Sequence, residues 1–200
     1  MLRNMHDHFE CIVVGVSAGG MEALKTILPA LPANFSLPII IVQHMRADAR
    51  DWYLANHFNS LLTSTVKIAN DKEAIENNHI YLAPAGYHLL VEDDRTFSLS
   101  SDAKVNYARP SIDVLFESAA FVFGPALIGI ILTGANSDGA KGLKAITEAG
   151  GQAVIQDPST AEVSAMPSAA RNLCKNAKIT PLPEIANYLI KVTEEKGRLI

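Results

Sequence analysis

The sequence predicts an α/β fold: a doubly wound, mainly parallel sheet with helices on both faces and a small antiparallel hairpin excursion. Three observations predict it. Short runs rich in Val and Ile alternate with helical patterns along the chain. Several of these runs, such as residues 11–16 and 38–44, are continuously apolar, as expected of parallel strands buried on both faces. Residues 79–100 hold three strand signals separated by turns too short for helices.

The expected elements follow one another along a single domain over residues 11–195, after a tail over residues 1–10. The expected strands are residues 11–16, 38–44, 66–69, 79–84, 88–92, 96–100, 126–134 and 152–156. The expected helices are residues 21–31, 47–62, 111–123, 138–151, 167–174 and 183–197. We expect all of residues 79–100 to leave the main sheet as an antiparallel excursion.

Composition excludes several classes of partner. The 17 basic and 21 acidic residues give a net charge of −4, and the basic residues are scattered, so nucleic acid is not an expected partner. No apolar run approaches the roughly 20 residues that span a bilayer, and no signal peptide opens the chain, so we expect no membrane insertion. Cys11 and Cys174 form no paired motif, which favours reduced thiols and a cytoplasmic location.

A lone serine with glycines on both sides lies in the connection between the first expected strand and the helix that follows it. Gly15, Gly19 and Gly20 permit a sharp turn around Ser17, which would expose the hydroxyl as in a nucleophile elbow. No lysine follows the glycines as in a Walker A loop, and Ser17 occupies the middle glycine of a dinucleotide fingerprint. A plain turn with a helix cap is the alternative.

A serine nucleophile needs a base, and His44 ends the second strand at the same edge of the sheet. A histidine that merely caps the strand is the alternative. His6, His8, His57, His79 and His88 are weaker candidates, with His88 held in reserve as a buried structural histidine. No histidine pair has metal-ligand spacing, so we expect no metal.

The third group is expected after the long strand at residues 126–134. Asp138 opens the next helix there, and its alternative role is a helix N-cap. Asp113 is the alternative acid, although first-turn compensation of a helix dipole fits it better. The order Ser, His, Asp differs from that of α/β-hydrolases.

The chain also resembles a known family. The ordered segments "VGVSAGG", "PIIIVQHM", "IYLAPAGYHLLV", "ARPSIDVLFESAA", "GIILTGANSDGAKGL", "AGGQAVIQD" and "MPSAA" resemble the catalytic domain of CheB, the protein-glutamate methylesterase of bacterial chemotaxis. The resemblance covers about residues 11–190 and carries the family's triad to Ser17, His44 and Asp138. It implies hydrolysis of γ-glutamyl methyl esters on the cytoplasmic helical region of methylated chemoreceptors, possible deamidation of receptor glutamines, and no cofactor.

The oxyanion and substrate-facing residues are expected beside the serine and in the 134–136 loop. They are Ala18, Gly19, Gly134, Ala135 and Asn136. Ala18 and Ala135 replace the threonine and methionine that are usual in the family, so we expect a substrate surface that differs from the usual one. Only about ten residues precede the first strand, so we expect no receiver domain.

Two other functions stay open at this point. One is a catalytically idle module that docks on receptors or signalling partners. The other is an esterase for a different substrate.

Overall fold

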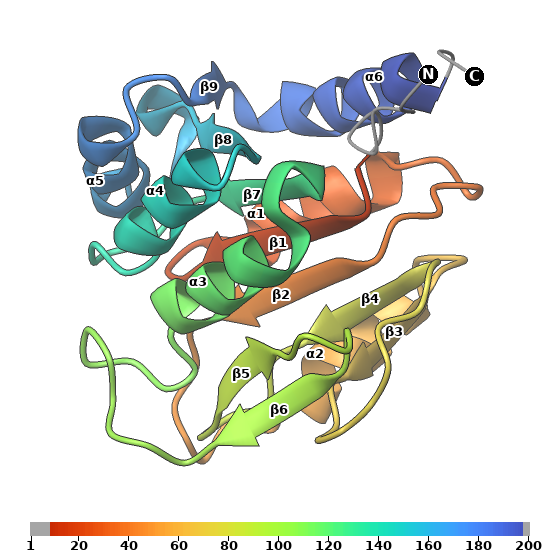
Figure 1. Cartoon of the computed structure of the whole chain (residues 1–200), viewed down its shortest axis with the longest axis vertical. Helices are drawn as coiled ribbons and strands as arrows, with labels where there is room; N and C mark the ends of the chain where they lie inside the picture. The colour runs from red at the N-terminus through yellow and green to blue at the C-terminus, as the bar shows by residue number, and fades with distance from the viewer. Residues whose placement is uncertain (1–8, 198–200) are drawn as a thin grey trace.

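The computed structural model describes residues 9–197 of the chain (Figure 1). In chain order the elements are β1 (Cys11–Val16), α1 (Gly20–Ile27), β2 (Ile39–Gln43), α2 (Trp52–Asn59), β3 (Thr65–Ile68), β4 (His79–Leu82), β5 (His88–Val91), β6 (Phe97–Ser100), α3 (Ile112–Phe123), β7 (Leu127–Ile131), α4 (Ala140–Glu148), β8 (Gln152–Gln156), α5 (Ala165–Leu173), β9 (Lys178–Thr180) and α6 (Ile185–Gly197). Short 3₁₀ helices lie at Leu28–Ala30, Gly124–Ala126, Pro158–Thr160 and Leu182–Glu184.

The main sheet is parallel throughout, in the order β3-β4-β2-β1-β7-β8-β9. The predicted doubly wound sheet is therefore confirmed. β1 lies between β2 and β7, and Gly15 near its end pairs with both Val42 and Ile131. Because these three strands end level with one another, the residues that follow them meet at one edge.

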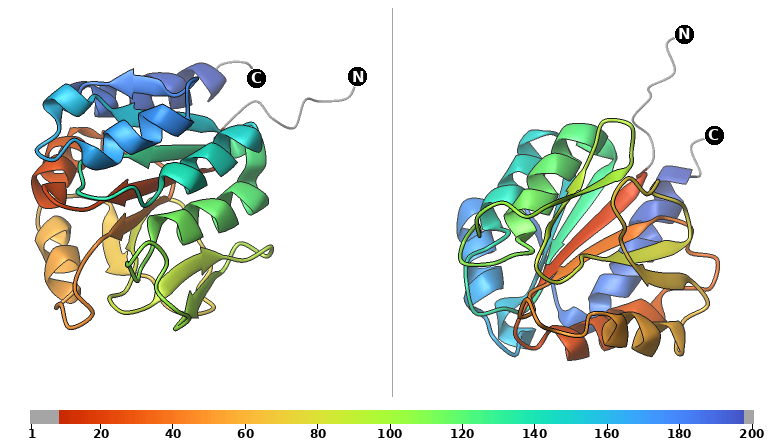
Figure 2. Two further views of the ribbon diagram at one scale, coloured as in Figure 1. Left: turned by 90° about the vertical axis from the view of Figure 1, so that its left-hand side faces the viewer. Right: turned by 90° about the horizontal axis from the view of Figure 1, so that it is seen from below.

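Helices cover both faces of the sheet, as Figure 2 shows with the sheet seen from below. Cys11 and Val13 of β1 point to one face, where they pack under α3, α4 and the β5–β6 hairpin. Ile12 and Val14 point to the other face and pack under α1, α2 and α6. Burial of β1 on both faces explains its continuous apolar sequence.

The excursion is smaller than predicted. β5 and β6 form the expected antiparallel hairpin as a separate two-stranded sheet, but β4 pairs in parallel with β2 and β3 inside the main sheet. The prediction for residues 79–84 was wrong because the loop over residues 69–78 makes the parallel connection from β3 without a helix. Ile80, Tyr81 and Leu82 are all buried, as an internal strand requires.

The edge strand β9 was not predicted. It has three residues, and only Ile179 is strongly apolar. Its pairing with β8, from Val154 opposite Lys178 to Gln156 opposite Thr180, extends the sheet by one strand. Such a short strand is specified by its neighbour rather than by its own sequence.

Candidate active site

Ser17 directly follows β1 and lies in a tight turn that enters α1. Its N–H donates to Thr133 O over 3.0 Å, and the Gly20 N–H donates to Ser17 O over 2.9 Å. Gly19 has φ +77°, the left-handed conformation that favours glycine. A Cβ at Gly20 would lie 2.1 Å from Gln43 Oε1. The turn therefore needs both glycines, as the sequence predicted.

His44 directly follows β2 and is hydrogen-bonded to Asp138. The distance from Nε2 to Asp138 Oδ2 is 2.8 Å, and the two side chains are 12% and 0% exposed. The His44 N–H donates to Val16 O over 3.0 Å, which fixes His44 beside the end of β1. No hydrogen bond joins His44 to the Ser17 hydroxyl in the described part of the chain.

The Asp138 carboxylate accepts hydrogen bonds from several donors besides His44. Oδ2 accepts from the Ile112 N–H at 2.7 Å, and Oδ1 accepts from Ser111 Oγ and Asn106 Nδ2, each at 2.8 Å. Burial alone would raise the pKa of Asp138, but the donors, His44 first among them, hold that pKa below its ordinary value. Asp138 is thus an ionised acceptor, and His44 Nε2 must carry the proton that it donates.

Asp113, the alternative acid, does not contact His44. Its Oδ1 accepts from the Gly142 N–H in the first turn of α4 at 2.7 Å, and its Oδ2 accepts from Asn106 Nδ2 at 2.7 Å. Burial, partly offset by the Gly142 N–H and reinforced by the charge of Asp138, raises the pKa of Asp113.

Each aspartate therefore accepts hydrogen bonds from N–H groups of the helix that begins beside the other aspartate. For Asp138 this differs from the alternative role as a helix N-cap, whereas Asp113 does lie in the first turn of its helix, as the sequence interpretation has it. Asp138 is not the N-cap of α4, because Gly139 takes that position without a side-chain bond, and Asp138 instead binds N–H groups at the start of α3. Asp113 lies in the first turn of α3 but accepts from α4. Only packing between α3 and α4 could reveal this exchange.

Four backbone N–H groups, two in the Ser17 turn and two in the loop after β7, donate to no acceptor among the described residues. They belong to Ala18, Gly19, Ala135 and Asn136. Gly134 does not fit the predicted oxyanion role, because its N–H donates to Val163 O over 3.0 Å.

Gln43 and Thr133 support the site, and the sequence interpretation missed both. Gln43 Nε2 donates to Ser17 O and to His44 O at 3.0 and 3.1 Å, so it ties the two loops together. Thr133 Oγ1 donates to Ala18 O at 2.8 Å. Their only sequence signal is their place at the ends of β2 and β7.

Two of the other histidines, His88 and His79, have structural surroundings. His88 is 2% exposed; its Nε2 lies 3.0 Å from Ala103 O and its Nδ1 accepts from the Ser111 N–H. His79 starts β4, at the opposite edge of the sheet from Ser17. His6 and His8 lie outside the described residues.

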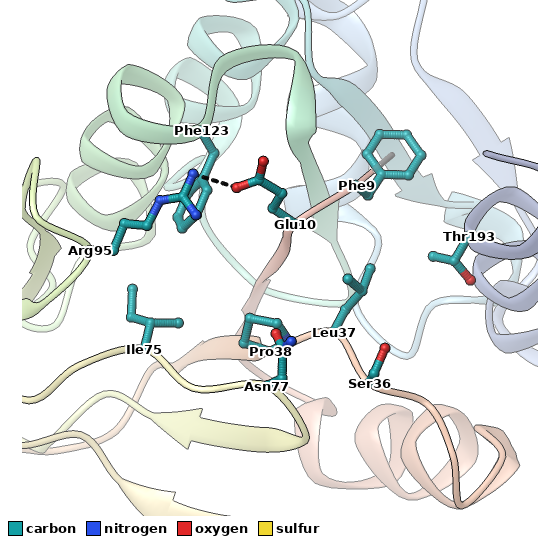
Figure 3. A pocket seen from close by; sticks show the side chains of 10 residues that line it. All are labelled: Phe9, Glu10, Ser36, Leu37, Pro38, Ile75, Asn77, Arg95, Phe123 and Thr193. Atoms are coloured by element: carbon teal, nitrogen blue, oxygen red, sulfur yellow. Dashed lines mark ion pairs between the residues drawn. The ribbon is translucent and has the colours of Figure 1, made fainter. Parts of the chain in front are cut away.

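The molecule has a hollow at each edge of the sheet. One of about 330 Å³ borders Ser17 and is lined further by Met21, Met45, Arg50 and Tyr53, among others. A larger one, of about 610 Å³, lies where β1 and β2 begin (Figure 3). It is lined by Phe9, Glu10, Ser36, Leu37, Pro38, Ile75, Asn77, Arg95, Phe123 and Thr193. The described residues that line it carry hydroxyl groups but include no histidine that could activate them.

Two further features are absent from residues 9–197. No helix there is long and apolar enough to cross a membrane. No cluster of three or more His, Cys, Asp or Glu side chains there could hold a metal ion.

A serine at a strand–helix turn, next to a histidine bound to a buried carboxylate, is the arrangement of serine hydrolases. Residues 12–189 match the sequence model of the family described as CheB methylesterase, and the chain belongs to that family.

Similar proteins cover most of the chain. A protein of Leptospira interrogans is 50% identical over 189 residues, which are 94% of this chain and 96% of that protein. A protein-glutamate methylesterase/protein-glutamine glutaminase of Archaeoglobus fulgidus is 35% identical over 93% of this chain and 54% of its own length. The crystal structure of the Thermotoga maritima CheB methylesterase catalytic domain aligns with a TM-score of 0.88 at 33% identity, covering 92% of this chain and 98% of that one.

Proposed function

We propose that the protein removes methyl esters from γ-glutamyl side chains of chemoreceptors, with Ser17 as nucleophile, His44 as general base and acid, and Asp138 as the group that orients His44. The observation that carries this proposal is the hydrogen bond between His44 Nε2 and the buried Asp138 carboxylate, at the edge where Ser17 follows the central strand β1.

The first half-reaction forms an ester between Ser17 and the substrate. Because His44 Nε2 donates to Asp138, Nδ1 is the ring nitrogen without a proton, and it takes the proton of Ser17 Oγ. Oγ then attacks the ester carbonyl carbon. The tetrahedral intermediate collapses as the bond to the methoxy oxygen breaks, and His44 gives its proton to the departing methanol. Asp138 stabilises the imidazolium formed in between.

The N–H groups of Ala18, Gly19, Ala135 and Asn136 are the donors that would hold the oxyanion, since they have no acceptor among the described residues. The start of α1 adds the positive end of a helix dipole. These groups belong to the backbone, so the alanines at positions 18 and 135 leave the oxyanion hole intact.

In the second half-reaction, water attacks the glutamyl-Ser17 ester. His44 takes a proton from the water and returns one to Ser17, which leaves a glutamate side chain on the receptor. A receptor glutamine would react in the same way with ammonia as the leaving group, and the names of several relatives include this protein-glutamine glutaminase activity. Neither half-reaction needs a cofactor.

The test is methanol release from membranes that carry radiolabelled methylated chemoreceptors. We expect the wild-type protein to release label and Ser17→Ala to release almost none. Release by Ser17→Ala at a large fraction of the wild-type rate would refute the assignment of the nucleophile. No release by the folded wild-type protein would refute the substrate.

A further inference from the structure

The loop between β6 and α3 carries an unusual backbone. Asn106 and Tyr107 have φ values of +50° and +63°, so two consecutive non-glycine residues are left-handed. Val105 and Ala108 on either side exchange two backbone hydrogen bonds, of 3.1 and 2.9 Å, which closes a tight two-residue turn. Backbone strain of this kind tends to persist where it holds a functional group in place.

The turn directs the Asn106 amide between two carboxylates. Its Nδ2 lies 2.7 Å from Asp113 Oδ2 and 2.8 Å from Asp138 Oδ1. The nitrogen has two hydrogens, one for each carboxylate, whereas the amide oxygen would be repelled by both. Tyr107, the other residue of the turn, is 97% exposed.

Among residues 9–197, Asn106 is the one side chain that bonds both carboxylates. Ser111 Oγ and the Ile112 N–H also bind Asp138, but both come from the start of α3 and do not touch the Asp113 carboxylate. The charge of Asp138 contributes to the raised pKa of Asp113, so the two acids are close enough to repel each other. Nearby charges are Glu117 on α3 and Lys141 on α4.

We infer that Asn106 is a positioning residue, which holds Asp138 in the rotamer that orients His44 and screens it from Asp113. This inference rests on the proposed function, because it assigns Asn106 a part in the same reaction. Without the amide, Asp138 Oδ1 loses one donor and the repulsion from Asp113 is no longer screened. The remaining donors, which come from the start of α3, still hold the carboxylate, so its alignment with His44 is weakened rather than lost. The imidazole then has a weaker preference for the tautomer with the proton on Nε2.

A matched pair of glycine substitutions tests the inference. Asn106→Gly and Tyr107→Gly both keep the left-handed turn, but only the first removes the bridging amide. We expect Asn106→Gly to lower kcat about tenfold with KM little changed, and Tyr107→Gly to leave kcat within about twofold of wild type. Asn106→Asp keeps the shape, replaces the donor with a third carboxylate and should lower kcat further. It also serves as the second variant should Asn106→Gly fail to fold.

A spectroscopic readout separates this inference from the proposed function. The ¹⁵N shifts of the His44 ring report its tautomer without any turnover, and the His44 signals are assigned by their loss in His44→Asn. We expect mainly the Nε2-protonated form in the wild-type and Tyr107→Gly proteins, and a mixture in Asn106→Gly. An unchanged tautomer with unchanged kcat in both Asn106 variants would overturn the inference. If the tautomer shifts while the wild-type protein releases no methanol, the inference stands and the proposed substrate fails.

Discussion

The two edges of the main sheet differ in the size of their hollows and in the polar groups that they carry. The amino edge has the larger hollow, about 610 Å³ against about 330 Å³ beside Ser17. Its charged pair, Glu10 with Arg95, has side chains 29% and 56% exposed. At the carboxyl edge, Asp138 is fully buried and bonded to His44. The polar groups that the proposed reaction needs lie at the carboxyl edge, beside the smaller of the two hollows.

The direction of the helices explains this difference. In a parallel sheet every helix that follows a strand begins at the carboxyl edge, so α1 and α4 bring their unpaired N–H groups and positive dipole ends there. The start of α3 reaches the same edge and binds Asp138. The site thus has donors for a buried carboxylate and, in the proposed reaction, for an oxyanion, whereas helix C-termini face the other edge.

The largest expected difference between the two edges comes from removing one serine hydroxyl at each edge. We expect Ser17→Ala to lower kcat at least about 10⁴-fold, because triad members act as a unit. Ser36→Ala, in the larger hollow, should leave kcat unchanged. Methyl ester hydrolysis by both purified variants is the measurement. Equal losses would mean that the chemistry is not confined to the carboxyl edge.

The second test compares the two buried aspartates of the carboxyl edge. Asp138→Asn should lower kcat about 10³- to 10⁴-fold through the loss of histidine orientation. Asp113→Asn should lower it less than about tenfold, because its carboxylate does not contact His44. Initial rates at saturating substrate decide between them. If Asp113→Asn is the crippling change, the third member of the triad is misassigned.

The same two aspartates should give opposite pH dependences of stability. Asp138 has a pKa below its ordinary 3.8, so its contribution to the free energy of unfolding is present above pH 3.8 and is lost as the pH falls through the lower folded-state value. Asp113 has a raised pKa, so its contribution is present below pH 3.8 and is lost as the pH rises through the folded-state value.

Thermal unfolding across the acid range measures these contributions. The gap in Tm between wild type and Asp138→Asn should narrow as the pH falls below 3.8. The Tm of Asp113→Asn relative to that of the wild type should rise as the pH rises above 3.8. Parallel curves for all three proteins would contradict the assigned shifts.

A smaller effect is expected at the rim beside Ser17, where Ala18 and Ala135 are both exposed. Ala18→Thr with Ala135→Met adds apolar contact and one hydroxyl, so we expect KM on a methylated chemoreceptor to fall about tenfold. The backbone donors do not change, and kcat should change less than the KM. A collapse of kcat with KM unmoved would mean that these positions belong to the catalytic machinery.

The smallest effect belongs to the amino edge. Glu10→Gln should leave kcat unchanged and lower the free energy of unfolding by less than about 1 kcal/mol, as for other exposed ion pairs. Arg95→Gln should lose somewhat more, because its guanidinium also lies 5.4 Å from the Phe123 ring centre. Urea unfolding at low and high salt separates the contribution of the Glu10–Arg95 ion pair, which salt screens, from that of the contact between Arg95 and the Phe123 ring. A loss of activity in Glu10→Gln would give the amino edge a role in catalysis.

Most of the fold could be predicted because its signals are local. The runs at residues 11–16 and 126–134 are apolar at nearly every position, and burial on both faces leaves few alternatives for such strands. β4 was misassigned because the residues of a strand do not show which other strand it pairs with. The β3–β4 connection is a loop, so the usual sign of a parallel pair was missing from the sequence.

The amino-acid sequence alone was enough to assign the main polar residues to the carboxyl edge of the sheet. Strand ends mark Ser17 and His44, and the long buried strand leads to Asp138. Strand direction follows from the alternation of elements, so these three residues belong to one edge before any contact is known.

Only the tertiary structure decided how those groups are held. Asp138 and Asp113 bind each other's helices, and Asn106 reaches both from a loop whose sequence gives no hint of its direction. Gly134, which the sequence marked as a donor, turns its N–H to Val163. Hydrogen bonds between residues far apart in the chain depend on packing distances of a few tenths of an ångström, and no local pattern encodes those distances.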